Sequence, residues 1–224
     1  MKNLLIAATA LIAFNTQAQV EKNVGDFSEI RTTNRINIEL IPSSKNVVVL
    51  DSKDENNVSL VNKNGKLAVK NNLKELVSDK DSNVTVKVYF KDLNSIEAES
   101  GSYIFSTKTI EATKLKLNAS SGSQLDIKIK AKNVEAKVFA GATMELEGKA
   151  DTGTLIANAG GTIDAKNLNF VTVDATVNAG GKIDVKASET VNAATRAGGS
   201  VNVYGNPKTV TEKTTAGGNI NRVK

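Results

Sequence analysis

The chain has 224 residues, no Cys, no His and no Trp, and its formal net charge is +5. The absence of Cys and His excludes a disulfide framework, His-based catalytic triads, Cys nucleophiles and the usual zinc sites. Because basic and acidic residues alternate along the chain, no concentrated basic face for nucleic acid is expected.

The first segment has the pattern of a secretory signal peptide. Met1-Lys2-Asn3 is positively charged, residues 4–14 are apolar, and Ala18 provides a small residue for cleavage. The apolar run is shorter than the roughly 20 residues that a transmembrane helix needs. We therefore expect a signal peptide at 1–18 and a mature domain at 19–224, exported to the periplasm, the outer cell surface or the medium without a transmembrane segment.

Residues 26–99 contain short alternating segments separated by turn residues. Strands are expected at 36–40, 47–50, 66–70 and 84–88, with turns at 42–44, 54–57 and 62–65 and one helical turn at 73–77. We interpret this part as irregular first coils of the same domain, because no linker composition separates it from the rest.

Residues 100–224 contain seven copies of one motif, in which a small residue and a glycine precede an apolar-polar-apolar triplet. The first glycines are Gly101, Gly122, Gly141, Gly160, Gly180, Gly198 and Gly217, which lie 18 to 21 residues apart. A period near 20 that is built from short alternating segments is typical of a solenoid.

Positions counted from the first glycine show how the repeat folds. Positions −3, +3 and +5 are mostly apolar and alternate with polar positions, which is the period of a β-strand. Glycine tolerates the positive φ of a sharp corner between two strands. The leucine-rich repeat, the main rival, needs a Leu-x-x-Leu-x-Leu framework that this chain lacks. The sequence therefore predicts a single all-β domain, a right-handed parallel β-helix with a coil period of about 19–20 residues.

The last copy differs from the others because Arg222 stands at position +5, where the preceding copies carry Ser or an apolar residue. No obvious capping segment follows. Arg222 and Lys224 are expected to discourage end-to-end strand addition. The alternative, that this end docks on a second copy in a homo-oligomer, stays open.

Position +4 is expected to point outward and collects four carboxylates in consecutive coils. They are Asp126, Glu145, Asp164 and Asp184. Stacked carboxylates repel each other and suit a Ca²⁺ ion, which prefers oxygen ligands. The interpretation we favour is a charge-balanced face without a metal or other cofactor, on which Lys128, Lys166 and Lys186 compensate the column.

The sequence offers little support for a lyase site or for a carbohydrate-stacking site. Polysaccharide lyases with this architecture combine acids that bind Ca²⁺ with a basic residue, but Arg196 is the sole Arg in the regular strands before the last copy and has no acidic cluster in its column. Carbohydrate stacking would use exposed aromatic rings, and Phe105, Phe139 and Tyr204 occupy different columns. Asn158 and Asn178 at position −2 are interpreted as a structural stack.

Several segments together resemble a known family. They are Phe27–Ile30, Ile36–Leu40, Val47–Val49, Asn64–Leu67, Val86–Phe90, Ile96–Ser102, the Gly-Gly-x-Ile/Val repeats and the final Gly218–Asn221. This combination is similar to the putative auto-transporter adhesin head GIN domain family of Bacteroidetes-type bacteria. The resemblance implies a right-handed parallel β-helix with a surface or envelope role, and it brings no catalytic motif.

The expected function is accordingly non-catalytic. The chain is interpreted as an exported adhesin or cell-envelope binding module whose partner is a cell-surface or extracellular polysaccharide or protein. Long solenoid faces suit extended ligands of this kind. The alternatives left open are a polysaccharide lyase-like enzyme and a purely structural envelope protein.

Overall fold

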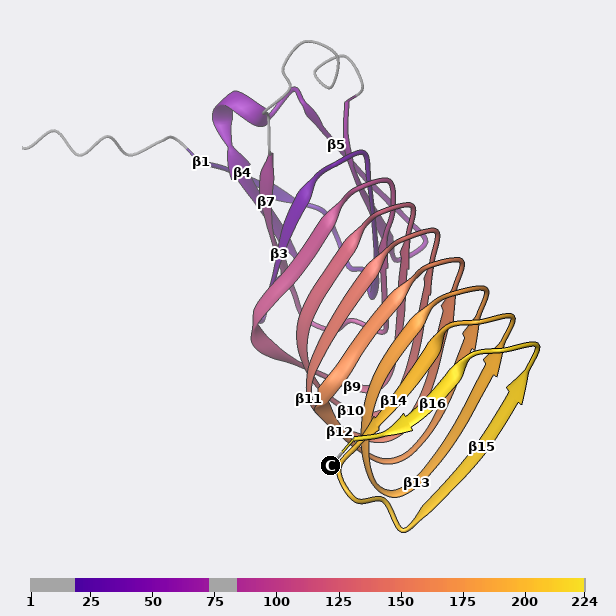
Figure 1. Ribbon diagram of the computed structural model, residues 1–224. Helices are drawn as coiled ribbons and strands as arrows, with labels where there is room; N and C mark the ends of the chain where they lie inside the picture. The colour runs from indigo at the N-terminus through magenta and orange to yellow at the C-terminus, as the bar shows by residue number, and fades with distance from the viewer. Residues whose placement is uncertain (1–18, 73–83, 224) are drawn as a thin grey trace, which may run out of the picture.

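The computed structural model describes residues 19–72 and 84–223, which form a solenoid of stacked β-strands (Figure 1). The predicted signal peptide and the predicted helical turn at 73–77 lie outside the described residues. The first strands are β1 (Gln19–Asn23), β2 (Glu29–Thr33), β3 (Asn37–Pro42), β4 (Val47–Asp51), β5 (Val58–Lys63), β6 (Lys66–Asn71), β7 (Thr85–Phe90) and β8 (Ser95–Ala98). The later strands are β9 (Tyr103–Ser120), β10 (Gln124–Phe139), β11 (Thr143–Asn158), β12 (Thr162–Asn178), β13 (Lys182–Arg196), β14 (Ser200–Tyr204), β15 (Thr209–Thr215) and β16 (Asn219–Arg222). A short 3-10 helix, η1 (Ser52–Asp54), follows β4.

Each regular coil is one long strand that begins after a glycine corner and ends at the next. The neighbouring strands β9, β10, β11, β12 and β13 pair in parallel, with equivalent residues of successive copies opposite each other. The coil after β13 is divided into two shorter strands: β14 pairs with the first part of β13, and β15 pairs with the second part. The predicted parallel solenoid is thereby confirmed.

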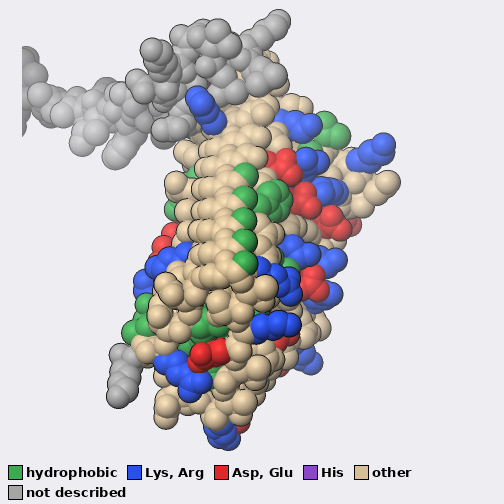
Figure 2. All heavy atoms as spheres, turned by 45° about the vertical axis from the view of Figure 1, so that its right-hand side comes forward, with side chains coloured by type: hydrophobic (Ala, Val, Ile, Leu, Met, Phe, Trp, Pro, Cys, Tyr) green, Lys and Arg blue, Asp and Glu red, His purple; other side chains and the backbone are tan. Residues whose placement is uncertain are grey.

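Each corner contains two adjacent left-handed residues, and the last two corners contain a third, Gly199 or Gly218. All seven predicted corner glycines have positive φ, between 69° and 89°. The residue before each glycine, Ser or Ala, also has positive φ, between 45° and 56°. A side chain at such a φ is strained, so a small one is favoured there. The corners form a regular ridge with a line of small hydrophobic groups along it (Figure 2).

The second glycine of the later copies has a packing role that the sequence pattern did not reveal. A Cβ added at Gly161 would lie 2.8 Å from Cγ2 of Val138, and one at Gly181 would lie 3.0 Å from Cβ of Ala157. Val138 and Ala157 occupy position −3 of the preceding coil. The inner side of the corner is therefore filled by the neighbouring coil, which leaves no room for a side chain.

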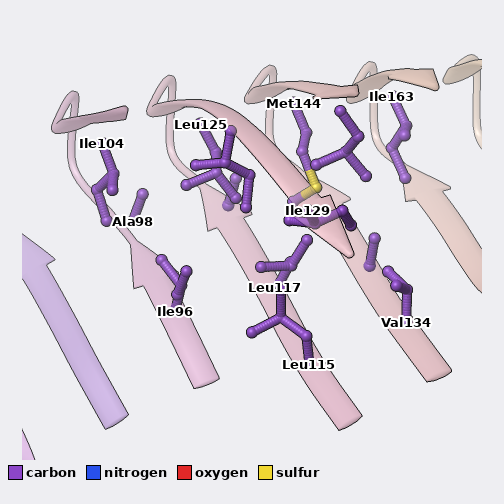
Figure 3. Packing of buried hydrophobic residues seen from close by; sticks show 14 of the residues in the cluster. Ile96, Ala98, Ile104, Leu115, Leu117, Leu125, Ile129, Val134, Met144 and Ile163 are labelled. Carbon is purple, nitrogen blue, oxygen red and sulfur yellow. The ribbon is translucent and has the colours of Figure 1, made fainter. Parts of the chain in front are cut away.

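The core is a set of inward columns that run along the solenoid. At position +3, Ile104, Leu125, Met144 and Ile163 are each at most 1% exposed and lie one per coil (Figure 3). In β10 buried and exposed residues alternate over most of the strand, as the predicted period of two requires. Burying one such aliphatic side chain contributes about 1.5–3 kcal/mol to the free energy of unfolding. With no disulfide in the chain, this burial is the main source of stability.

The N-terminal part, interpreted as irregular first coils, contains both parallel and antiparallel strand pairs. The predicted strands are present as β3, β4, β6 and β7. Strand β2 pairs in parallel with β8, and β3 pairs in parallel with β9. In contrast, the pairs β1–β4, β4–β7 and β5–β6 are antiparallel. The hairpin β5–β6 turns at Asn64 and Gly65, which both have positive φ, as a tight two-residue turn requires. Antiparallel strands thus close this end of the solenoid.

Candidate functional site

The predicted acidic column is assembled in register on the side of the solenoid. Asp126 pairs with Glu145, Glu145 with Asp164, and Asp164 with Asp184, on the adjacent strands β10 to β13. Phe105 precedes the column, and Asn202 and Asn221 follow it. The parallel pairing therefore brings together four carboxylates that are far apart in the sequence.

Lysines compensate the C-terminal half of this column, although not all of them are the predicted ones. Lys166 forms the expected ion pair with Asp164. Asp184 is paired with Lys182, whose Nζ lies 2.8 Å from Oδ2, and not with the predicted Lys186. Lys128 pairs with Glu147. The hydrogen bond from Lys182 to Asp184 raises the pKa of Lys182, and the bond to Asp164 likewise raises that of Lys166.

Asp184 also differs from expectation in its burial. It was expected to be exposed, but it is only 4% exposed. Asn202 donates a hydrogen bond from Nδ2 to Oδ1 of Asp184 at 2.6 Å, and Asn221 donates to Oδ1 of Asn202 at 2.9 Å. Because both carboxylate oxygens of Asp184 already accept from side chains, the C-terminal part of the column functions as a polar ladder between coils.

Aromatic residues border the other end of the column. The rings of Tyr103 and Phe105 stack with centroids 5.2 Å apart, and the Tyr103 hydroxyl lies 3.5 Å from Oδ2 of Asp126. Partial burial raises the pKa of Tyr103, and the negative charges of Asp126 and Glu145 raise it further. Tyr103 therefore keeps its proton and serves as a donor at neutral pH.

A calcium titration is expected to give no heat on this column. Within residues 19–72 and 84–223, no group of three or more acidic side chains is arranged to hold a metal ion. The oxygens of Asp164 and Asp184 are engaged by Lys166 and Lys182. Calorimetry on the wild type and on Asp164→Ala/Asp184→Ala checks this. Saturable heat from the wild type that disappears in the variant would instead establish a cation site.

A groove that the sequence pattern did not predict runs along the solenoid on another side. Its volume is about 1010 Å³, and it is lined by three consecutive residues from the middle of each long strand. These triplets are residues 111–113, 130–132, 149–151, 169–171 and 186–188 of β9 to β13. Because each coil adds one triplet, the groove follows the axis of the solenoid.

The groove has an apolar base and charged walls. The middle residues of four triplets, Ala131, Ala150, Phe170 and Ala187, are 2–8% exposed. Their flanking residues are mainly exposed and polar. Val171 is an exception, because it is apolar and 44% exposed. The buried alanines lie beneath the groove, and the exposed flanking side chains line it. Such a shape suits an elongated ligand.

The charges are distributed unevenly along the groove. Asp92 and Glu111 lie toward its N-terminal end, and Glu111 forms an ion pair with Lys130 at 3.3 Å. From β10 onward the lining contains Lys130, Lys132, Lys149 and Lys186, against a single acid, Asp151. The C-terminal part of the groove is therefore positively charged.

The other predicted surface residues do not gather into a site. Phe139 is 42% exposed, while Phe105 and Tyr204 are half-buried in a different part of the coil. Asn178 donates from Nδ2 to Oδ1 of Asn158 at 2.7 Å, which confirms the predicted structural stack. Arg196 is exposed and continues that column beyond Asn178.

Solved structures show the same fold. A putative adhesin from Bacteroides fragilis NCTC 9343 superposes with a TM-score of 0.80 at 19% identity, over 92% of this chain and 96% of the other. A putative adhesin from Parabacteroides merdae ATCC 43184 gives 0.69 at 19% identity, over 94% and 98%. A putative lipid binding protein from Parabacteroides distasonis ATCC 8503 gives 0.71 at 16% identity, over 92% and 96%.

Sequence comparison identifies the family. A search of curated proteins found no match. No helix in the described part of the chain is long and apolar enough to cross a membrane. The model of one family matches residues 26–207, which include most of the coils and both faces described above. This chain therefore belongs to the family described as "putative auto-transporter adhesin, head GIN domain".

Proposed function

We propose that this protein is a non-catalytic, exported binding module of the adhesin type that holds an extended acidic polysaccharide in the axial groove. The observation that carries the proposal is the repetition of the groove: β9 to β13 each contribute one triplet to a continuous lining. A polymer whose units repeat along the axis can form the same contacts with successive coils. The adhesin names of the family and of two similar structures support a binding role.

The charge of the groove supports an acidic ligand. Lys130 and Lys149 are neighbours on β10 and β11, and Lys186 lies on β13 beyond Asn169. Adjacent coils are about 4.8 Å apart, so these side chains form a row of donors for repeated carboxylate or sulfate groups. Val171, which is 44% exposed, would contact the apolar face of a sugar ring.

Removing two lysines from the groove is expected to weaken binding about tenfold. Lys149→Ala/Lys186→Ala deletes two solvent-exposed charged contacts, which together contribute about 1.4 kcal/mol to the binding free energy. The measurement is retention of acidic and neutral polysaccharides and of matrix proteins on immobilised protein, with and without Ca²⁺. Released unsaturated sugar is read in the same assay.

A control variant separates local contacts from net charge. Lys137 and Lys213 are exposed and lie in one column on the opposite arm of the coil, outside the groove. Lys137→Ala/Lys213→Ala therefore removes the same charge without changing the groove. We expect its affinity to stay within about twofold of the wild type, because surface charges separated by more than the Debye length of about 8 Å are screened. Equal loss in both variants would contradict groove binding, and Ca²⁺-dependent release of unsaturated sugar would replace the proposal with a lyase.

A further inference from the structure

Two inward columns of the solenoid end in charged residues at its C-terminal end. One column contains Leu117, Ala136, Leu155, Ala175 and Ala193, each at most 3% exposed. The next residue in register, on β15, is Glu212. A carboxylate thus occupies a position that all preceding coils fill with an apolar side chain.

A second inward column ends in the same way. At position +5 it contains Ile127, Leu146, Ala165, Val185 and Val203, each at most 2% exposed. The residue paired with Val203 is Arg222 on β16. The sequence indicated that Arg222 interrupts the pattern, but not that an acid on β15, before the last glycine corner, interrupts a second inward column.

These two residues bind each other across the end of the core. Nε and Nη2 of Arg222 each lie 2.8 Å from Oε1 of Glu212. Their side chains are 63% and 38% exposed, so water still solvates the pair. Covering it with another layer of protein would remove that water, and the lost hydration of both ions opposes association.

The strands that carry the pair are open edges. Within the described residues, β15 pairs with β13 alone and β16 with β14 alone. They lie at the end of the stack, opposite the end that β1, β4 and β5 close (Figure 1). Open edges attract strands of other molecules. Val210 and Ile220, which pack partly buried against the core, add apolar surface to this end.

We propose that the Glu212–Arg222 pair is a polar cap that prevents this end from pairing with a second copy of the chain. Without the pair, both columns would continue as apolar surface between two open edges. Two copies related by a twofold axis could then join β15 to β15 and continue the core across the interface. The cap lies at the end of the solenoid and does not depend on ligand binding in the groove.

The test is the oligomeric state of the purified protein and its variants by sedimentation. Glu212→Ala/Arg222→Val restores the residue types of the preceding coil, and we expect its mass to double with increasing concentration. The wild type is expected to remain monomeric at the same concentrations. Arg222→Val alone is also expected to remain monomeric, because it leaves a carboxylate that association would bury unpaired.

Two controls locate the new interface. Adding Thr214→Lys to the double variant returns a charge to the same end face and should restore the monomer, since Thr214 stands in the adjacent inward column. Lys114→Ala/Glu135→Ala removes an ion pair of 2.8 Å from the side of the solenoid and should stay monomeric. The cap is disproved by a wild type that already forms a dimer sensitive to Thr214→Lys.

A second variant tests the cap in case Glu212→Ala/Arg222→Val folds poorly. Glu212→Gln/Arg222→Gln removes both charges while keeping long polar side chains, and we expect it to dimerise at higher concentration than the apolar double variant. Circular dichroism confirms that each variant is folded. If every folded charge-removing variant stays monomeric at all concentrations, the pair does not act as a cap.

Discussion

Replacing Gly148 with alanine is expected to lower the free energy of unfolding by more than about 3 kcal/mol. Gly148 has φ +116°, a conformation that L side chains rarely adopt. An added Cβ would collide with the backbone carbonyl oxygen of Ile129 and lie 3.1 Å from its carbonyl carbon. Because β10 is hydrogen-bonded on both sides, Ile129 has little freedom to move away.

The matched control for this substitution is Gly160→Ala. Gly160 has φ +75°, and an added Cβ would meet no atom within 4 Å. This variant carries the strain of a left-handed residue without a collision, which costs about 1 kcal/mol. Chemical unfolding followed by circular dichroism measures both. Similar losses in the two variants would show that φ strain, and not contact between coils, dominates.

Removing the ring of Phe170 is expected to cost about 3–5 kcal/mol. Phe170 is 2% exposed and stands in a column otherwise made of alanines. Space for its ring exists because β11 has a glycine beside it. A Cβ at Gly153 would lie 2.9 Å from Cδ1 and Cζ of Phe170. Phe170 and Gly153 therefore form one packing unit across two coils.

This unit predicts a specific non-additivity. Gly153→Ala alone should destabilise by about 1–3 kcal/mol, because the ring must move. In Phe170→Ala/Gly153→Ala the new methyl group enters the vacated space, so the double variant should be less destabilised than the sum by at least about 1 kcal/mol. The same unfolding measurement on all three variants provides the cycle. Strict additivity would mean that the two positions do not interact.

The repeating columns explain why so much of the fold was accessible from the sequence. A glycine every 18 to 21 residues and alternation at period two are local properties, and both were read directly from residues such as Gly101 and Ile104. They predicted the corners, the inward columns and the stacking of Asp126, Glu145 and Asp164. Where the alternation is weaker, as at Glu29–Thr33, a strand was not predicted.

The groove could not be found in this way, because its residues do not lie at a fixed distance from the glycine. The register shifts between Ile127 and Ile129, between Glu145 and Glu147, and between Ala165 and Asn169. These irregularities lie between the corner and the groove. Counting from the glycine therefore assigns Lys130 and Lys186 to different columns, whereas the structure places both on the groove.

By itself, the sequence determined the period of the coil, the side of each strand that faces the core and the positions that need small residues, because these depend on local sterics and hydrophobic alternation. Only the tertiary structure decided which charges meet and where a groove forms. Lys182 neutralises Asp184, Glu212 reaches Arg222 across the open end, and triplets from five coils form one groove. These contacts join residues in different strands or on different sides of a coil. Their pairing depends on bulges, side-chain reach and the three-dimensional course of the chain, and no local pattern encodes it.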